Sequence, residues 1–549
     1  MKSQLVVGLI LSMGLLANQA HAAKLKSFCT VPENGGSVTG INIEERLPIA
    51  SVSKVFTSLF AITQMPINRK VYTQFYYTHL GNGVYDVHIQ GGIEPYFNRE
   101  SMQWLISKLN EVGVTKINIL SYDENFKYLH LTEKAFSVTR LAVDPVTKKK
   151  KNRRLFYDPV SGKNELAGPN PDAVGFQLGQ TAFILANYNV TKAMAAKDGK
   201  TLVKQLFFAP KTIKFVAVNE FKAAATTKKA FIASPDLLHM IKLMNWKSNN
   251  HASDKMLLLG GGLSKFNSFY HGNMKFTESD LRFINGSGQN ADLGGRLYNE
   301  ATCSSVLRAL NGLKKNLEKQ NAKLEDALAV IGGDIGSTFS GKYITDATRL
   351  SVIAKTGTVG TNVTLAGMIS AKTGNHFFFY NVETLAATGR QGKGKNSSAV
   401  EANRSRAIIA QHLNSLIQSK EFGGPNPINY KIKVYDTEKF DEEGTEAELV
   451  ETISEEGKST LTAADVPVFA IDKNAPPIGI VSKAKPGAKP AVKPAVVKPV
   501  AAKPAPAKPA VKSAPAKAIS KAVKPKADLA KLDALIHSHT GPDSTVNNF

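Results

Sequence analysis

The composition of this 549-residue chain changes abruptly after Lys420, so we expect the folded core to lie in the residues before it. Residues 436–456 hold ten acidic side chains against one lysine, and residues 483–526 hold twelve lysines and no acidic residue. The basic stretch is built of Lys-Pro-Ala near-repeats, and proline at this density excludes helices and central strands. We therefore expect an acidic linker at 421–482 and a disordered Lys/Pro/Ala-rich tail at 483–549.

The N-terminus has the parts of a secretory signal peptide. Lys2 is followed by an apolar run at 5–16 and then by the small-x-small sequence Ala20-His21-Ala22. A membrane anchor is the alternative, but about 20 apolar residues are needed to span a bilayer. We expect residues 1–22 to be removed and the protein to be exported to the periplasm or cell envelope. Export argues against nucleic acid as the partner of this chain, although its formal net charge is +24.

The chain has two cysteines, Cys29 and Cys303. Outside the cytoplasm they can form a disulfide that ties the mature N-terminus to a distant helix. Two separate buried thiols are an equally good interpretation, and the sequence does not choose between them.

The hydrophobic patterns indicate a mixed α+β/α/β fold with an inserted segment. Apolar residues at helical spacing follow Ser51, and a mixture of strand and helix patterns then fills residues 68–230. Strand patterns return at 350–354, 363–371 and 377–382, before a long helix pattern at 399–418. This order predicts one α+β unit inserted into another.

A serine and a lysine lie one turn apart where the first predicted helix begins. Ser51 and Lys54 project from the same helix face, so the lysine can take the serine proton if it is uncharged. Burial lowers the pKa of a lysine, and a second ammonium group nearby lowers it further. A similar Ser-x-x-Lys sequence at 482–485 lies in the predicted disordered tail and has no such context.

The second ammonium group has a candidate in Lys355, which follows an apolar strand pattern and precedes Thr356 and Gly357. On an edge strand Lys355 can bind a substrate carboxylate, Gly357 allows a close approach of the substrate backbone, and Thr358 offers a backbone N–H. The second Lys-Thr-Gly sequence, at 372–374, lies between two strand patterns and is predicted to be a hairpin turn.

The segment Ser248-Asn249-Asn250 follows a predicted helix at 237–244 and, taken alone, is best explained as a helix-capping loop. The order S-x-x-K, S-x-N, K-T-G is nevertheless the motif order of penicillin-binding proteins and serine β-lactamases. Lys54 and Ser248 are 248 − 54 = 194 positions apart. The chain thus resembles the class C low-molecular-mass penicillin-binding proteins, which are D-Ala-D-Ala carboxypeptidase/endopeptidases of the PBP4 type.

Further segments carry the same resemblance. Residues 91–95 are similar to a Gly-rich turn of the family's inserted domain, and 329–338 are similar to the run before its third motif. Asn285-Gly286-Ser287-Gly288 resembles the family's Asp-Gly-Ser-Gly segment, with Asn285 in place of the usual Asp. Ser253-Asp254 stand where Ala-Glu commonly follows the second motif. These departures bear on substrate preference and leave the three core motifs intact.

The resemblance implies a penicillin-binding-protein/β-lactamase-like transpeptidase fold, an antiparallel sheet with helices. It implies a peptidase domain divided into residues 23–67 and 231–420 by one or more inserted domains at 68–230.

The resemblance also implies a serine acyl-enzyme mechanism. The implied catalytic residues are Ser51, Lys54, Ser248, Asn250 and Lys355. Thr356, Gly357 and Thr358 would bind substrate, and the backbone N–H groups of Ser51 and Thr358 would form the oxyanion hole. The substrates would be peptidoglycan stem peptides, and β-lactam antibiotics would be covalent inhibitors. No cofactor or metal is implied, because His88, His239 and His251 lack a ligand-like grouping.

Two other interpretations fit parts of the sequence. A β-lactamase or esterase shares the three motifs, but the long insertion is not typical of compact β-lactamases. A catalytically silent envelope protein that binds wall polymer would not need the complete set of motif residues. The basic tail is expected to bind anionic wall or envelope polymer in a salt-sensitive manner. The sequence does not indicate an oligomeric state.

Overall fold

The structure is a computed structural model that describes residues 23–97, 99–126, 138–143, 150–155, 163–164, 168–169, 210–289, 297–339, 341–360, 362–384, 397–434, 442–443 and 469–471. The predicted signal peptide, the Lys/Pro/Ala-rich tail and most of the predicted acidic linker lie outside these residues. The chain divides into two units, Met1–Ile480 and Val481–Phe549, and every described residue belongs to the first.

A seven-stranded sheet forms the centre of the region that was predicted to be the peptidase domain, in the order β15-β17-β18-β19-β1-β2-β22. Neighbouring strands are antiparallel except for β22, which pairs parallel to β2. The strands are β1 (Lys24–Pro32), β2 (Ser37–Ile41), β15 (Ala329–Val330), β17 (Val352–Val359), β18 (Asn362–Ala371), β19 (Gly374–Glu383) and β22 (Ala470–Ile471). Lys372 and Thr373 form the turn between β18 and β19, which confirms the predicted hairpin.

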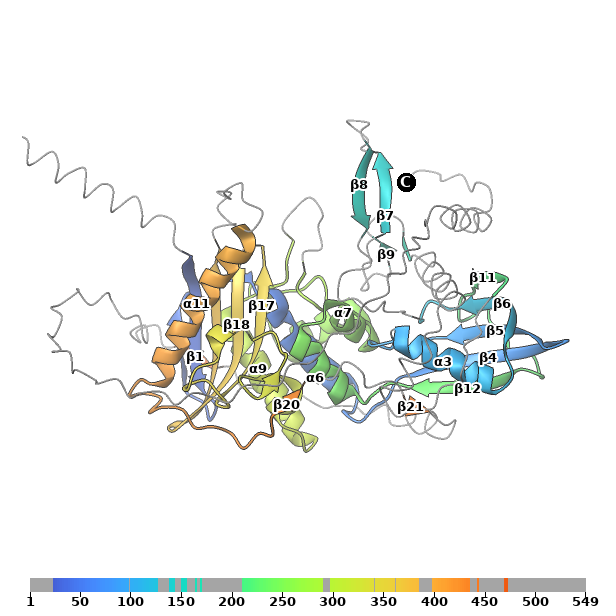
Figure 1. Ribbon diagram of the computed structural model, residues 1–549. Helices are drawn as coiled ribbons and strands as arrows, with labels where there is room; N and C mark the ends of the chain where they lie inside the picture. Colours follow the sequence, from blue (N-terminus) through green and yellow to red (C-terminus); the bar gives the residue numbers. More distant parts are fainter. Residues whose placement is uncertain are drawn as a thin grey trace, which may run out of the picture. The chain divides into compact units, whose positions relative to one another are not determined.

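Both faces of this sheet are covered, as the alternation of its side chains requires. On β1, Phe28 packs into one hydrophobic cluster and Cys29 into the other. Helix α11 (Ser397–Ile417) covers the first face (Figure 1). Helices α2 (Ser53–Gln64), α6 (Leu237–Lys247), α7 (Asn250–Leu259) and α9 (Cys303–Lys319) contribute to the cluster on the second face.

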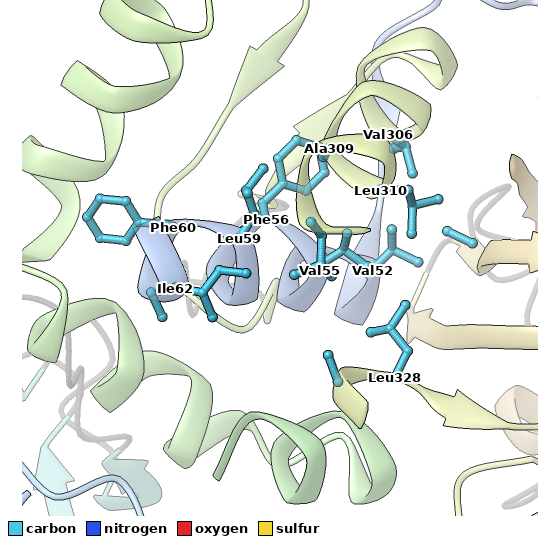
Figure 2. Packing of buried hydrophobic residues seen from close by; sticks show 14 of the residues in the cluster. Val52, Val55, Phe56, Leu59, Phe60, Ile62, Val306, Ala309, Leu310 and Leu328 are labelled. Carbon is cyan, nitrogen blue, oxygen red and sulfur yellow. The ribbon is translucent and has the colours of Figure 1, made fainter. Parts of the chain in front are cut away.

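Helix α2 is enclosed by its neighbours on every side. Val55, Phe56 and Leu59 are fully buried, and they pack near Val306 and Leu310 of α9 (Figure 2). Burying each such side chain contributes about 1.5–3 kcal/mol. This packing fixes the start of α2, where Ser51 and Lys54 lie.

A disulfide joins Cys29 on β1 to Cys303, the first residue of α9, with a Cα–Cα distance of 6.0 Å. The pairing resolves the alternative that the sequence left open. The bond ties the sheet to the helix that packs against α2, and it closes a loop across 274 positions.

The inserted region is a second α+β unit. Its six-stranded sheet has the order β11-β6-β5-β4-β12-β21, and α3 (Arg99–Glu111) connects the parallel strands β5 and β6. Apolar residues of β4, β5, β6 and α3 form its core. The strands are β4 (Tyr72–Gly81), β5 (Val84–Gln90), β6 (Lys116–Tyr122), β11 (Thr212–Phe215), β12 (Lys228–Ala233) and β21 (Glu442–Glu443).

The remaining elements are short. They are β3 (Leu47–Pro48), η2 (Ala50–Val52), β7 (Val138–Val143), β8 (Lys150–Leu155), β9 (Lys163–Asn164), β10 (Gly168–Pro169), α8 (Gly262–Asn267), η3 (Ser268–Asn273), β13 (Leu281–Arg282), β14 (Glu300–Ala301), α10 (Leu324–Ala327), β16 (Asp334–Ile335), η4 (Gly341–Tyr343) and β20 (Lys433–Val434). Among the helices of the described ranges, none combines the length and the apolar character that a bilayer crossing requires.

Within the described ranges, the predicted acidic linker contributes three short strands to the fold. β20 pairs with β16, β21 pairs with β12 of the inserted sheet, and β22 pairs with β2. Phe469, next to β22, is buried in the core. Apolar residues scattered among the acidic ones therefore return this segment to the body of the protein.

Candidate active site

Ser51 lies in the 3-10 turn η2, immediately before α2. The residue before it, Ala50, has φ +51°, a conformation that costs a non-glycine residue about 1–3 kcal/mol. Neighbouring groups hold the turn in place. The hydroxyl of Thr364 on β18 donates to the Ile49 carbonyl at 2.9 Å, and the hydroxyl of Ser53 donates to the Ala50 carbonyl at 2.6 Å.

Two glycines let other segments approach this turn. A Cβ on Gly288 would lie 2.0 Å from the Ala50 carbonyl oxygen, and a Cβ on Gly357 would lie 3.0 Å from the Ile49 carbonyl oxygen. Gly357 belongs to the K-T-G motif, so glycine at this position brings strand β17 directly against the turn that carries Ser51.

Lys54 is fully buried, and its Nζ makes three hydrogen bonds. It donates to Ser51 Oγ at 3.0 Å, to Asn250 Oδ1 at 2.7 Å and to the Ser287 carbonyl at 3.0 Å. Burial lowers the pKa of Lys54 to about 7, and the nearby charge of Asp254 acts in the opposite direction. The amine next to Ser51 is therefore able to lose its proton near neutral pH.

The loop at 285–289 supplies one of these acceptors, and it contains the predicted departure from the family pattern. Asn285 Oδ1 accepts a hydrogen bond from the Gly288 N–H at 2.7 Å, and Asn285 Nδ2 donates to the Gln289 carbonyl at 2.9 Å. Asn299 Nδ2 donates to the Asn285 carbonyl at 2.7 Å. An amide side chain can make both bonds, whereas a carboxylate can only accept. Asn285 therefore keeps the loop closed against Lys54.

The S-x-N motif lies between two helices. Ser248 ends α6 in the left-handed conformation, with φ +58°. Asn249 Oδ1 accepts a hydrogen bond from the Ala252 N–H at 3.0 Å and so caps α7. The capping role that the sequence suggested belongs to Asn249. Ser248 and Asn250 on either side of it turn to the lysines.

Lys355 lies on β17 and is fully buried. Its Nζ donates to Ser248 Oγ at 2.9 Å and to the Thr356 carbonyl at 2.6 Å. Burial, and then the charge of Lys54, hold the pKa of Lys355 well below its ordinary value. The repulsion between the two amines thus lowers the pKa of Lys355, whereas the sequence had led us to expect that effect for Lys54.

The open edge of β17 carries the rest of the third motif. β15 pairs only with Ile353 and Ala354, and no other strand of the described ranges continues along that edge. The Thr356 hydroxyl is 2.6 Å from the Thr338 hydroxyl. Thr358 is exposed, and its hydroxyl accepts a hydrogen bond from Arg406 of α11.

The structure thus brings the five predicted catalytic residues together in two hydrogen-bonded groups. Lys54 bonds to Ser51 and Asn250, and Lys355 bonds to Ser248. Thr356, Gly357 and Thr358 lie on the same strand as Lys355. Sequence analysis did not identify the site contacts of four further residues: Ser287, Thr338, Thr364 and Arg406. Ser287 and Thr338 had a signal, since both lie in segments of family resemblance, but Thr364 and Arg406 are isolated polar residues. Among the described residues, no group of three or more His, Cys, Asp or Glu side chains could hold a metal ion.

The fold and the clustered motifs define a protein of the penicillin-binding-protein/β-lactamase-like class. No known family profile matches the chain, and no curated protein matches it. Solved structures do match. The predatory peptidoglycan endopeptidase Bd3459 of Bdellovibrio bacteriovorus is 29% identical with a TM-score of 0.60, over 77% of this chain and 100% of that chain.

A second predatory endopeptidase of the same organism, Bd0816, is 29% identical with a TM-score of 0.59, over 76% of this chain and 99% of that chain. Penicillin-binding protein 4 of Haemophilus influenzae is 15% identical with a TM-score of 0.47, over 72% of this chain and 97% of that chain. Similarity to the solved Bdellovibrio structures supports the resemblance of this chain to the PBP4-type penicillin-binding proteins.

Proposed function

We propose that the protein is a serine D-alanyl-D-alanine carboxypeptidase/endopeptidase that hydrolyses peptidoglycan stem peptides or their cross-links through an acyl-enzyme on Ser51. The observation that carries this proposal is the 3.0 Å hydrogen bond between Lys54 Nζ and Ser51 Oγ, made by a buried amine with a lowered pKa. A hydroxyl and an amine in this relation form an activated nucleophile.

In the acylation step, neutral Lys54 takes the proton of Ser51 as Ser51 Oγ attacks the carbonyl carbon of the D-Ala bond. The backbone N–H groups of Ser51 and Thr358 stabilise the oxyanion, and one such donor is typically worth about 2.7–4 kcal/mol. Asn250 keeps the amine in position through the hydrogen bond at 2.7 Å.

The leaving amine then needs a proton, and Lys54 holds the one that it took from Ser51. Ser248, whose Oγ is bonded to Lys355 Nζ at 2.9 Å, is suited to relay this proton to the amine, which leaves Lys54 neutral again. Collapse of the intermediate breaks the C–N bond and leaves the acyl group on Ser51. Water, deprotonated by Lys54, attacks this ester and releases the shortened peptide.

The matched structures favour a role in cutting cross-links as well as in trimming. Bd3459 is described as a peptidoglycan endopeptidase, and it has also been crystallised acylated by penicillin G. By analogy, β-lactam antibiotics would acylate Ser51 of this chain. The same analogy supports an endopeptidase activity beside the carboxypeptidase activity.

We also propose an extracytoplasmic location, which the Cys29–Cys303 disulfide supports because such bonds persist in oxidising compartments. The basic tail would then act as a tether to anionic wall polymer. Deletion of 483–526 is expected to weaken binding to isolated sacculi at low salt. Unchanged binding with an unchanged salt dependence would contradict the tether.

The catalytic proposal is tested by labelling with a fluorescent penicillin and by digestion of purified muropeptides. The wild type is expected to label at Ser51 and to release D-Ala or to separate cross-linked dimers. The Ser51→Ala variant is expected to do neither. Rapid turnover of the penicillin without muropeptide cleavage would favour a β-lactamase, and muropeptide cleavage retained by Ser51→Ala would exclude the proposed nucleophile.

A further inference from the structure

We propose that Arg406 selects substrates with a free carboxylate on the amino acid that leaves, acting from helix α11 together with the hydroxyl of Thr358. This inference rests on the proposed function and adds a specificity-determining residue to it. The S-x-x-K, S-x-N and K-T-G motifs do not contain Arg406.

The position of Arg406 is fixed at both of its terminal nitrogens. Nη2 donates to Thr358 Oγ1 at 3.1 Å, and Nη1 donates to Asn403 Oδ1 at 2.9 Å. Asn403 lies one turn earlier on the same helix, so the bond holds the guanidinium against its own helix face. The other bond brings it to the outer end of β17, next to Gly357, which itself packs against the turn before Ser51.

The direction of the bond to Thr358 has a chemical consequence. A guanidinium group only donates hydrogen bonds, so Thr358 Oγ1 is the acceptor. The hydrogen of that hydroxyl must then point away from Arg406. Since Thr358 is exposed on the open edge of the strand, the hydroxyl is free to donate to an acceptor that arrives in the site. A carboxylate accepts well from such a pair of donors.

Arg406 also supplies a charge that Lys355 is poorly placed to supply. Lys355 is fully buried, and its amine is already bonded to Ser248 Oγ and to the Thr356 carbonyl. Arginine stays protonated at all working pH values. Both bonds of Arg406 go to neutral oxygens, and within the described residues no carboxylate pairs with it. Arg404, two positions earlier, is instead paired with Glu401.

The two lysines and the arginine therefore divide the work. Lys54 acts as the base, Lys355 holds Ser248 for proton transfer to the leaving amine, and Arg406 with Thr358 recognises the negative charge next to that amine. Such a carboxylate is present wherever the amine that leaves is an α-amine, as it is in D-Ala and at the D-centre of a meso-diamino acid. A wall in which this carboxyl group is amidated would be a poor substrate.

The test uses the full chain and two synthetic stem peptides that end in D-Ala-D-Ala, one as the free acid and one as the carboxamide. We expect Arg406→Gln to lower kcat/KM for the free acid by about 10- to 100-fold, the range of a hydrogen bond to a charged group. The rate for the carboxamide should stay near that of the wild type, so the preference for the free acid collapses. Arg406→Lys should restore part of it, because it keeps the charge without the planar fork.

Arg404→Gln is the matched control, since it removes the same charge from the same helix, and it should behave as the wild type does. The unfolding midpoint of each variant checks that it folds. Arg406→Lys replaces Arg406→Gln in the test if the latter does not fold or if the carboxamide is cleaved too slowly to measure. In that case kcat/KM for the free-acid peptide is compared between Arg406→Lys and Arg404→Gln, and Arg406→Lys should have the lower value. Equal rates in these two variants would overturn the proposal.

Two more outcomes are informative. The proposal is wrong if Arg406→Gln keeps the wild-type preference for the free acid, or if Thr358→Val and Arg406→Gln lower kcat/KM independently of each other. A wild type that cleaves neither peptide and takes no penicillin label would instead contradict the proposed function itself.

Discussion

The peptidase region and the inserted region both bury titratable side chains, but they arrange them differently. In the peptidase region Lys54 and Lys355 bond to side chains from distant parts of the sequence, Asn250 and Ser248. In the inserted region Asp123 instead accepts hydrogen bonds from backbone N–H groups. Two of these groups belong to Asn125 and Phe126, which follow Asp123 by two and three positions.

His88 likewise contacts residues of its own region. Its Nδ1 is 2.9 Å from Ser121 Oγ, and its ring stacks on Phe221 with centroids 3.7 Å apart. Burial lowers the pKa of His88 to about 4 and raises that of Asp123 to about 6. These shifts are marked, yet both groups serve a buried turn or a stacked pair. A perturbed pKa therefore marks a candidate active site only where several elements converge on a nucleophile.

Removal of the base should show the largest difference in activity between the two regions. Lys54→Met keeps an unbranched side chain of nearly the same length but leaves Ser51 without a proton acceptor, so kcat/KM should fall by about 10²- to 10⁴-fold. His88→Phe, which replaces a buried ring of the inserted region, should retain activity on the same muropeptides. Similar losses in both variants would mean that buried ionisable groups of the two regions act alike.

The pH dependence of acylation should identify which region governs it. Protonated Lys54 cannot accept the serine proton, and its pKa is lowered to about 7. The rate of penicillin acylation should therefore rise by about tenfold per pH unit below pH 7 and level off above it. A midpoint near 4, the pKa of His88, or near 10.5, that of an ordinary lysine, would contradict the assignment.

The disulfide should separate the stabilities of the two regions. Replacing Cys29 and Cys303 by serine should lower the free energy of unfolding of the peptidase region by about 2–5 kcal/mol, because a long loop is no longer closed. Hydrogen exchange is the measurement: β1 and α9 should lose protection, while β4, β5 and β6 of the inserted region keep theirs. Equal loss throughout would show that the two regions unfold as one unit.

Asp123 should affect stability without affecting catalysis. Its pKa in the folded state, about 6, lies above the ordinary value of 3.8. The folded protein thus keeps a proton that the unfolded chain releases, and the free energy of unfolding should fall by about 1–3 kcal/mol as pH rises from about 4 to about 6. Asp123→Asn should remove this part of the pH dependence and leave the rate of penicillin acylation unchanged. A fall in that rate would assign Asp123 a role beyond its turn.

Sequence patterns predicted the elements better than their ends. The strand expected at 350–354 runs through the K-T-G motif to Val359 as β17, because its polar residues face a site and not the core. The segment after Lys420 was predicted to be a linker because acidic residues dominate its composition. The few apolar residues that pack against the fold form no recognisable pattern among them.

The sequence by itself determined the three motifs and their order. Local spacing places Ser51 beside Lys54, and the flanking strand patterns distinguish the K-T-G motif at Lys355 from the hairpin turn at Lys372. Only the tertiary structure decided the disulfide, the acceptor at Ser287 and the contact between Arg406 and Thr358. The physical reason is distance along the chain: 274 positions separate the two cysteines, 233 separate Lys54 from Ser287 and 48 separate Arg406 from Thr358. Local periodicity carries no information over such separations, whereas packing of the sheet and its helices does.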